Sequence, residues 1–196
     1  MTDAMARRDV DELAALMLFH DRISGRLHTD EPGEVLRHIA EGVEEVLSAD
    51  KAIVVILNPD SGEIVATGDE QDGEEVLSYE ELMAGVTGRV LESGETVVAD
   101  RAELEAGEPG AVSRFLPGAE SVIATPLRFH EKLVGTLTAA NRDRPFDHGE
   151  VSILQAMASE AGMVIGYLMR LQSEQRQRRL ADTLRDVTAG MTSTLD

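Results

Sequence analysis

Cysteine is absent from the 196-residue sequence, and this absence excludes more chemistry than any other feature of the composition. Without thiols there are no disulfides, thiolate metal ligands, cysteine nucleophiles or thioether-linked chromophores. Trp is also absent and aromatic residues make up only 3% of the chain, so the core must be aliphatic. No uninterrupted apolar run of about 18 residues occurs, and no basic start leads into an apolar signal-peptide core. We therefore expect a cytoplasmic location and no membrane-spanning segment.

Basic residues are scarce, because 18 Lys plus Arg stand against 37 Asp plus Glu, a formal net charge of −19. Nucleic acids and anionic membrane surfaces are bound through basic patches, so this charge argues against both as partners. The length suits one domain with flanking helices, and a hydrophobic fraction of 42% can form a core.

Apolar spacing predicts two helices at the start of the chain, over residues 10–27 and 34–47, separated by the break Thr29–Gly33. A β-branched run at residues 51–57 and a second strand at residues 63–67 predict a hairpin through the turn Asn58–Gly62.

Residues 121–129 and 133–140 predict a second hairpin, with His130–Lys132 at its tip. Between the hairpins, a capping box at Ser78–Glu81 predicts a helix over residues 78–93, followed by a short strand at 96–99. The polar stretch 100–118 is expected to be a mobile connection.

Asp147 and Glu150 form a second capping pattern, which predicts the start of a long final helix. Its apolar positions are spaced by three and four, as in coiled coils: Val151, Leu154, Ala158, Ala161, Ile165 and Leu168. We expect this helix and the N-terminal helix to pair in a homodimer, the alternative being that both pack within one protomer.

These elements predict an α+β fold with an antiparallel sheet of five or six strands. The terminal helices should cover one face, and the 78–93 helix with the 100–118 connection should cover the other.

Four segments of the chain carry a resemblance to one known family. They are Gly85–Asp100, with its Ser-Gly-Glu turn; Ser121–Leu127, which ends in Pro-Leu; Leu133–Leu137, which contains Gly; and Asn141-Arg142, followed by Phe146 and Glu150. In this order and at these separations the chain resembles the GAF family of sensor domains, over about residues 32–168. The resemblance implies a GAF/PAS-like fold and a sensory, non-catalytic role inside a longer signalling protein, such as a histidine kinase of a two-component system.

The last segment departs from the Asn-Lys…Phe…acid pattern of cyclic-nucleotide-binding members. Arg142 stands where that pattern has Lys, and Glu150-Val151 stands where it has Asp-Glu. Arg and Lys are not equivalent at a site that needs a point charge. We therefore interpret Asn141, Phe146 and the capping residues as structural.

Catalytic motifs are missing from the sequence. Some small GAF proteins reduce methionine sulfoxide with thiols, which this chain lacks. Neither Gly-x-Ser-x-Gly nor a phosphate-binding Gly-x4-Gly-Lys-Ser/Thr occurs, and the five His residues are dispersed without metal-ligand spacing. A haem would need only one axial His, yet none lies in an apolar setting. We expect no enzyme activity and no metal; the cofactor, if any, is unknown.

Two functions remain open. The domain either binds a small ligand between the sheet and the 78–93 helix, or binds nothing and serves as a dimerising spacer that relays signals. The candidate pocket residues are Tyr79, Met83, Thr87, Phe115, Ile123, Thr125 and Thr138.

The chain is expected to divide into an N-terminal helix (1–30), a sensor domain (31–170), and a helical linker with the start of a truncated second domain (171–196). The last assignment rests on an internal match, in which residues 184–193 align without a gap on residues 20–29.

Overall fold

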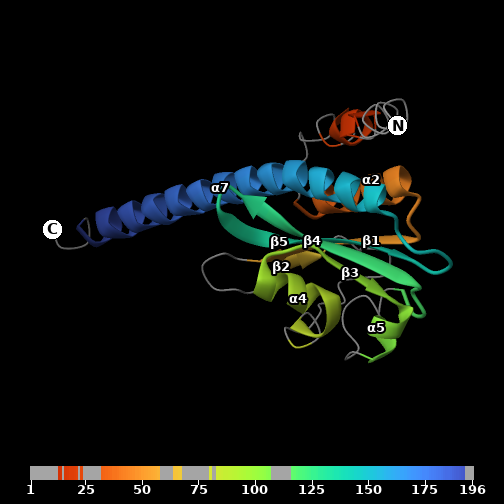
Figure 1. Ribbon diagram of the computed structural model, residues 1–196. Coiled ribbons are helices and arrows are strands. Elements are labelled where there is room, and N and C mark those ends of the chain that lie inside the picture. Colours follow the sequence, from red (N-terminus) through yellow and green to blue (C-terminus); the bar gives the residue numbers. More distant parts are fainter. Residues whose placement is uncertain are drawn as a thin grey trace.

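Five strands form one antiparallel sheet with the spatial order β2-β1-β5-β4-β3 (Figure 1). They are β1 (Lys51–Leu57), β2 (Ile64–Thr67), β3 (Val97–Asp100), β4 (Ser121–Phe129) and β5 (Lys132–Asn141). All four neighbouring pairs run antiparallel. The expected α+β class is therefore confirmed, with the lower of the two strand counts. The computed structural model describes residues 13–14, 16–21, 23, 32–57, 64–67, 80, 83–106 and 116–192.

Helices cover both faces of this sheet (Figure 1). Helices α2 (Pro32–Leu47) and α7 (His148–Thr192) lie on one face, as expected for the terminal helices. Helices α4 (Gly85–Ser93) and α5 (Arg101–Ala106) lie on the other. The chain thus has three layers, and the sheet separates α4 from α7.

The strands divide their side chains between two cores because alternate residues point to opposite faces. The larger core joins α2 and α7 to a set of strand residues: Ala52, Val54, Ile56, Ile123, Leu127, Leu137 and Ala139. The smaller core lies under α4 and consists of Val86, Val90, Ala99, Leu116, Ala119, Val122, Ala124 and Ala140. Both cores are almost wholly aliphatic, as the composition requires.

The predicted helix over residues 78–93 is interrupted at Ala84, and its predicted start, the capping box at Ser78, lies outside the described residues. One helical turn ends at Ala84, whose N–H donates to the Glu80 carbonyl at 2.9 Å. Ala84 then has extended torsion angles, and Gly85 has a φ of +74°, which favours glycine. Helix α4 starts there without a side-chain cap. The backbone of Met83 lies so close to Gly88 that a side chain at 88 would overlap the Met83 carbonyl.

The connection over residues 100–118 also differs from the expectation of an irregular loop. Its first part is helix α5, which directly follows β3. The N–H of Glu103 donates to the Asp100 carboxylate at 2.9 Å, a bond typical of a helix N-cap. The residues 107–115 lie outside the described part of the chain.

The N-terminal segment is helical where it is described, within residues 13–23. Phe19 and Ile23 are buried in the larger core, and His20 contacts Glu160 of α7. Leu13 and Met17 of this helix are 59% and 62% exposed. The helix therefore docks through Phe19 and Ile23.

Helix α7 uses most of its predicted dimer stripe within the protomer. Leu154, Ala158, Ala161 and Ile165 are fully buried against the sheet, while Val151 and Leu168 pack beside them half-buried. By length and apolar composition alone, His148–Ala181 could also cross a membrane. Its packing on the sheet is instead that of the core helix of a globular domain.

Candidate functional site

The face of the sheet beneath α4 is floored mainly by aliphatic and hydroxyl side chains, with one charged residue, Lys51, at the start of β1. The strand register aligns them in three rows: Ala99, Val122, Ala140 and Lys51; Val97, Ala124, Thr138 and Ile53; and Pro126, Thr136 and Val55. Val86 and Val90 of α4 pack on part of this floor.

Two hydroxyls interrupt this apolar floor. Thr136 is 0% and Thr138 is 2% exposed, and neither Oγ1 has a hydrogen-bond partner among the described residues. Buried polar atoms in native proteins are nearly always paired, and an unpaired one costs about 1–3 kcal/mol. The two hydroxyls lie two residues apart on the same face of β5, so one ligand with more than one polar group can reach both.

The candidate pocket residues do not share one face. Thr138 belongs to the floor beneath α4, and Thr87 is buried in α4 itself. Met83 is half-buried just ahead of α4. Ile123 is in the larger core, on the α7 side of the sheet. The hydroxyl of Thr125 also points to that side, where it bonds the Thr96 hydroxyl at 2.8 Å.

Ile123 and Thr125 therefore cannot line a pocket between the sheet and α4. The run Ser121–Thr125 is buried on both faces, so the sequence showed no polar alternation that could identify its sides. Tyr79 and Phe115 lie outside the described residues. Thr136 was missed, although its spacing of two from Thr138 places both on one face of a strand.

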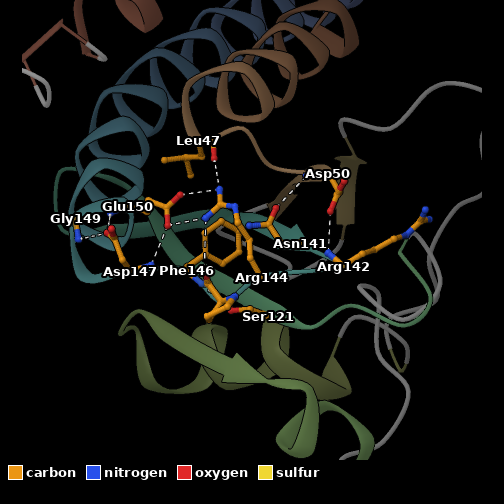
Figure 2. Close-up of polar contacts among 11 residues, drawn as sticks. Leu47, Asp50, Ser121, Asn141, Arg142, Arg144, Phe146, Asp147, Gly149 and Glu150 are labelled. Atoms are coloured by element: carbon orange, nitrogen blue, oxygen red, sulfur yellow. Dashed lines mark hydrogen bonds and ion pairs between the residues drawn. The ribbon is translucent and has the colours of Figure 1, made fainter.

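A second polar cluster joins the end of α2 to the start of α7 (Figure 2). Arg144 lies at its centre and donates to both carboxylate oxygens of Glu150, at 3.0 and 2.8 Å. The same guanidinium donates to the Leu47 carbonyl at the end of α2, at 2.8 Å. It also lies 5.6 Å from the ring centroid of Phe146. One side chain thus fixes two helices and the loop between β5 and α7.

The hydrogen bond that Arg144 donates to Glu150 raises the pKa of Arg144 further above its ordinary value, and the charges of Glu150, Asp143 and Asp147 act in the same direction. Arg144 consequently stays charged at every pH at which a protein is normally handled. Its side chain is 39% exposed, so water screens part of this attraction.

The predicted capping box at the start of α7 is present. The Asp147 carboxylate accepts from the N–H groups of Gly149 and Glu150, at 2.6 and 2.9 Å. In return Glu150 accepts from the N–H of Asp147 at 2.9 Å. Glu150 therefore serves the cap and the Arg144 ion pair at once.

The residues of the cyclic-nucleotide-like pattern have structural contacts. Asn141 is buried and accepts from the Asp50 N–H at 3.2 Å, and Phe146 packs in the larger core. The side chain of Arg142 is exposed, and its backbone N–H donates to Asp50 at 2.8 Å. The cation of this loop that pairs with Glu150 is Arg144, which sequence reasoning missed. Among the described residues, no three His, Asp or Glu side chains cluster in a way that could hold a metal ion.

Comparison with known families and solved structures agrees with this α+β fold. A family model described as GAF domain matches residues 29–166. The match spans well over half of the chain, so the chain belongs to the GAF family. No curated protein matches the sequence significantly.

Solved structures give the same fold at low sequence identity. The GAF domain of Acinetobacter phosphoenolpyruvate-protein phosphotransferase aligns with a TM-score of 0.64 at 17% identity, covering 83% of this chain and 97% of that one. Free methionine-R-sulfoxide reductase from Neisseria meningitidis, solved with its substrate, gives 0.58 at 17%, covering 82% and 93%. The nlh2 GAF domain from A. aeolicus, in an inactive state, gives 0.57 at 16%, covering 84% and 99%. One of these three structures is a reductase solved with its substrate, and the other two are GAF domains.

Proposed function

We propose that this chain is a non-catalytic sensory GAF domain that binds a small ligand on the α4 face of its sheet. The observation that carries this proposal is the pair of buried hydroxyls, Thr136 and Thr138, which lack partners among the described residues. A ligand that carries polar groups such as a carbonyl, amide or hydroxyl can bond the two hydroxyls and remove their desolvation cost. Their neighbours across the strands, Ile53, Val55, Ala124 and Pro126, carry no charge, which favours neutral groups at this point.

In this proposal the ligand state is relayed along α7 to an output domain of a two-component or similar signalling protein. Residues 31–170 form the sensor, residues 1–30 contribute a helix, and residues 171–196 form a linker that leads into a second domain. The relatives in signalling proteins support this role, and the absence of thiols supports a non-catalytic one. The location in this proposal is the cytoplasm.

A thermal-shift screen with nucleotides, haem and metabolites tests ligand binding. A ligand at about 100 times its Kd stabilises the native state by about 2.7 kcal/mol, which raises Tm by roughly 5 °C or more. Thr138→Val should abolish the shift, because it keeps the shape and removes the hydroxyl. Thr125→Val is the matched control, since its hydroxyl lies on the opposite face. A hit that survives Thr138→Val, or no hit at all, counts against the pocket.

The second candidate function is a ligand-free dimerisation spacer, and exposed apolar side chains favour it. Met163, Tyr167 and Leu171 of α7 follow one another at intervals of four and are 49%, 59% and 38% exposed. We propose that two copies pair through Met163, Tyr167 and Leu171, because most of the predicted dimer stripe of α7 is buried within the protomer. The acidic charge of −19 leaves nucleic acid and membranes as poor partners.

Engineered cysteines test this pairing directly, because the chain has none of its own. Tyr167→Cys should crosslink two chains under mild oxidation, and light scattering should give twice 21.2 kDa. Asp21→Cys, at an exposed position on the N-terminal helix and off this stripe, is the control. Equal crosslinking of both variants, or a monomer in solution, refutes the dimer. A dimer without any ligand-induced shift would support the spacer.

A further inference from the structure

We propose that the turn between α4 and β3, Gly94–Thr96, carries changes in α4 to α7 around the edge of the sheet. Helices α4 and α7 lie on opposite faces, so they cannot act on each other directly (Figure 1). Strand β3 is an edge strand, and the turn that precedes it has access to both faces.

The turn is tied firmly to α4. Gly94 has a φ of +67° and caps the helix by donating its N–H to the Val90 carbonyl at 2.8 Å. The Ser93 hydroxyl donates to the Arg89 carbonyl at 2.7 Å and accepts from the Glu95 N–H at 3.1 Å. A shift of α4 along or across the sheet must therefore move the turn with it.

The first link from the turn to α7 is direct. Gln155 of α7 donates from Nε2 to the Thr96 hydroxyl at 2.9 Å. The same hydroxyl bonds Thr125 of β4 at 2.8 Å, on the α7 side of the sheet. Because the sequence separation of Thr96 and Gln155 is 59 residues, this contact belongs to the tertiary fold.

The second link passes through Arg128 of β4. Its guanidinium donates to the Gly94 carbonyl at 2.8 Å, at the C-terminal end of α4 where a cation is favoured. The backbone of Arg128 lies against Gly162 of α7 so closely that a side chain at 162 would overlap the Arg128 carbonyl. Gly166, one turn later, is packed in the same way against the ring of Phe129.

The two links reach α7 seven residues apart, at Gln155 and Gly162, and so they hold a two-turn segment of the helix. A displacement of the turn bears first on this segment, because both links end on α7, whereas α2 packs on α7 and on the sheet. The use of this coupling as a signal relay rests on the proposed function, whereas the coupling itself is a property of the fold with or without a ligand.

The test loosens α4 and measures hydrogen exchange in α7, using the full chain and no ligand. Val90→Ala removes a fully buried contact between α4 and the sheet. We expect the exchange rates of amides 155–166 in α7 to rise by roughly threefold or more relative to those in α2. A factor of this size corresponds to the interaction energies found between residues in contact. Val90→Thr, which keeps the side-chain shape, is the milder input if Val90→Ala does not fold.

Val90→Ala is then combined with Gln155→Leu and Arg128→Met, which remove the two links between the turn and α7. The excess rise in α7 should disappear, while the rise in α4 remains. The matched control background is Gln172→Leu with Arg142→Met, two exposed side chains of the same types away from the turn, in which the excess should persist.

The proposal is overturned if amide exchange in α7 still rises more than in α2 after both links are removed. It is also overturned if Val90→Ala alone never raises exchange in α7 above the rise in α2. Because no ligand is used, this outcome is independent of the ligand screen, and failure of that screen leaves the coupling standing.

Discussion

Replacing Arg144 by Met should destabilise the domain by about 2 kcal/mol. The change removes the paired hydrogen bonds to Glu150, the bond to the Leu47 carbonyl, and the contact with the Phe146 ring. A hydrogen bond to a charged group contributes roughly 1.5–3 kcal/mol, an exposed ion pair about 0.2–1, and an exposed cation–π contact about 0.5–1. The side chain is 39% exposed and one guanidinium makes all three interactions, so their energies do not add fully. We therefore expect a loss of about 2 kcal/mol, in the lower part of the range for a hydrogen bond to a charged group.

Urea denaturation followed by circular dichroism measures this effect. The midpoint should fall while the slope m stays unchanged, because the surface exposed on unfolding is the same. Arg144→Lys should lose about half as much, since Lys keeps the charge but cannot bond both oxygens of Glu150. Arg142→Met, in the same loop with an exposed side chain, should change the free energy of unfolding by less than about 0.5 kcal/mol.

The contribution of Arg144 to the free energy of unfolding should be the same at neutral and at moderately alkaline pH. A pKa raised in the folded state gives a contribution that is fully present below the ordinary pKa of the guanidinium and is lost only above the folded value. The difference between the native chain and Arg144→Met should therefore be the same at about pH 7 and about pH 10. A difference below about 0.5 kcal/mol at either pH would refute the reasoning.

Further changes test other parts of the fold. Gly88→Ala should cost at least about 2 kcal/mol in urea denaturation, because its methyl group overlaps the Met83 carbonyl, and a smaller loss would show that the turn before α4 packs elsewhere. Asp147→Ala should cost about 1 kcal/mol through loss of the cap, with Asp147→Asn near neutral as the control; equal losses would contradict capping. Thr136→Val in the ligand-free chain should leave stability unchanged or raise it, whereas Thr125→Val should lower it by about 1 kcal/mol, and the reverse order would contradict the hydrogen-bond assignment.

The elements with strong local signals could be predicted from the sequence. The strand Ser121–Phe129 has the predicted bounds, and the reciprocal cap of Asp147 and Glu150 is present because its groups lie three residues apart. Both features depend on neighbours in the chain, which a sequence displays.

Features that depend on distant contacts could not be predicted. The break before α4 follows from Met83 packing on Gly88, and nothing in the capping pattern at Ser78 reveals that contact. The pairing of Glu150 with Arg144 rather than Arg142 depends on where the loop folds back toward Leu47. The faces of Ile123 and Thr125 were hidden because both sides of β4 are buried there.

Helix α7 is one helix of 45 residues, and its described core residues lie between Val151 and Met169. At 1.5 Å per residue, the part from Leu168 to Thr192 is about 36 Å long. A tilt of about 5° at the packed half would move the far end by about 3 Å, more than a tilt of the same size moves any strand. A small tilt of the packed half would thus become, at the far end of the helix, a displacement comparable to the size of a side chain.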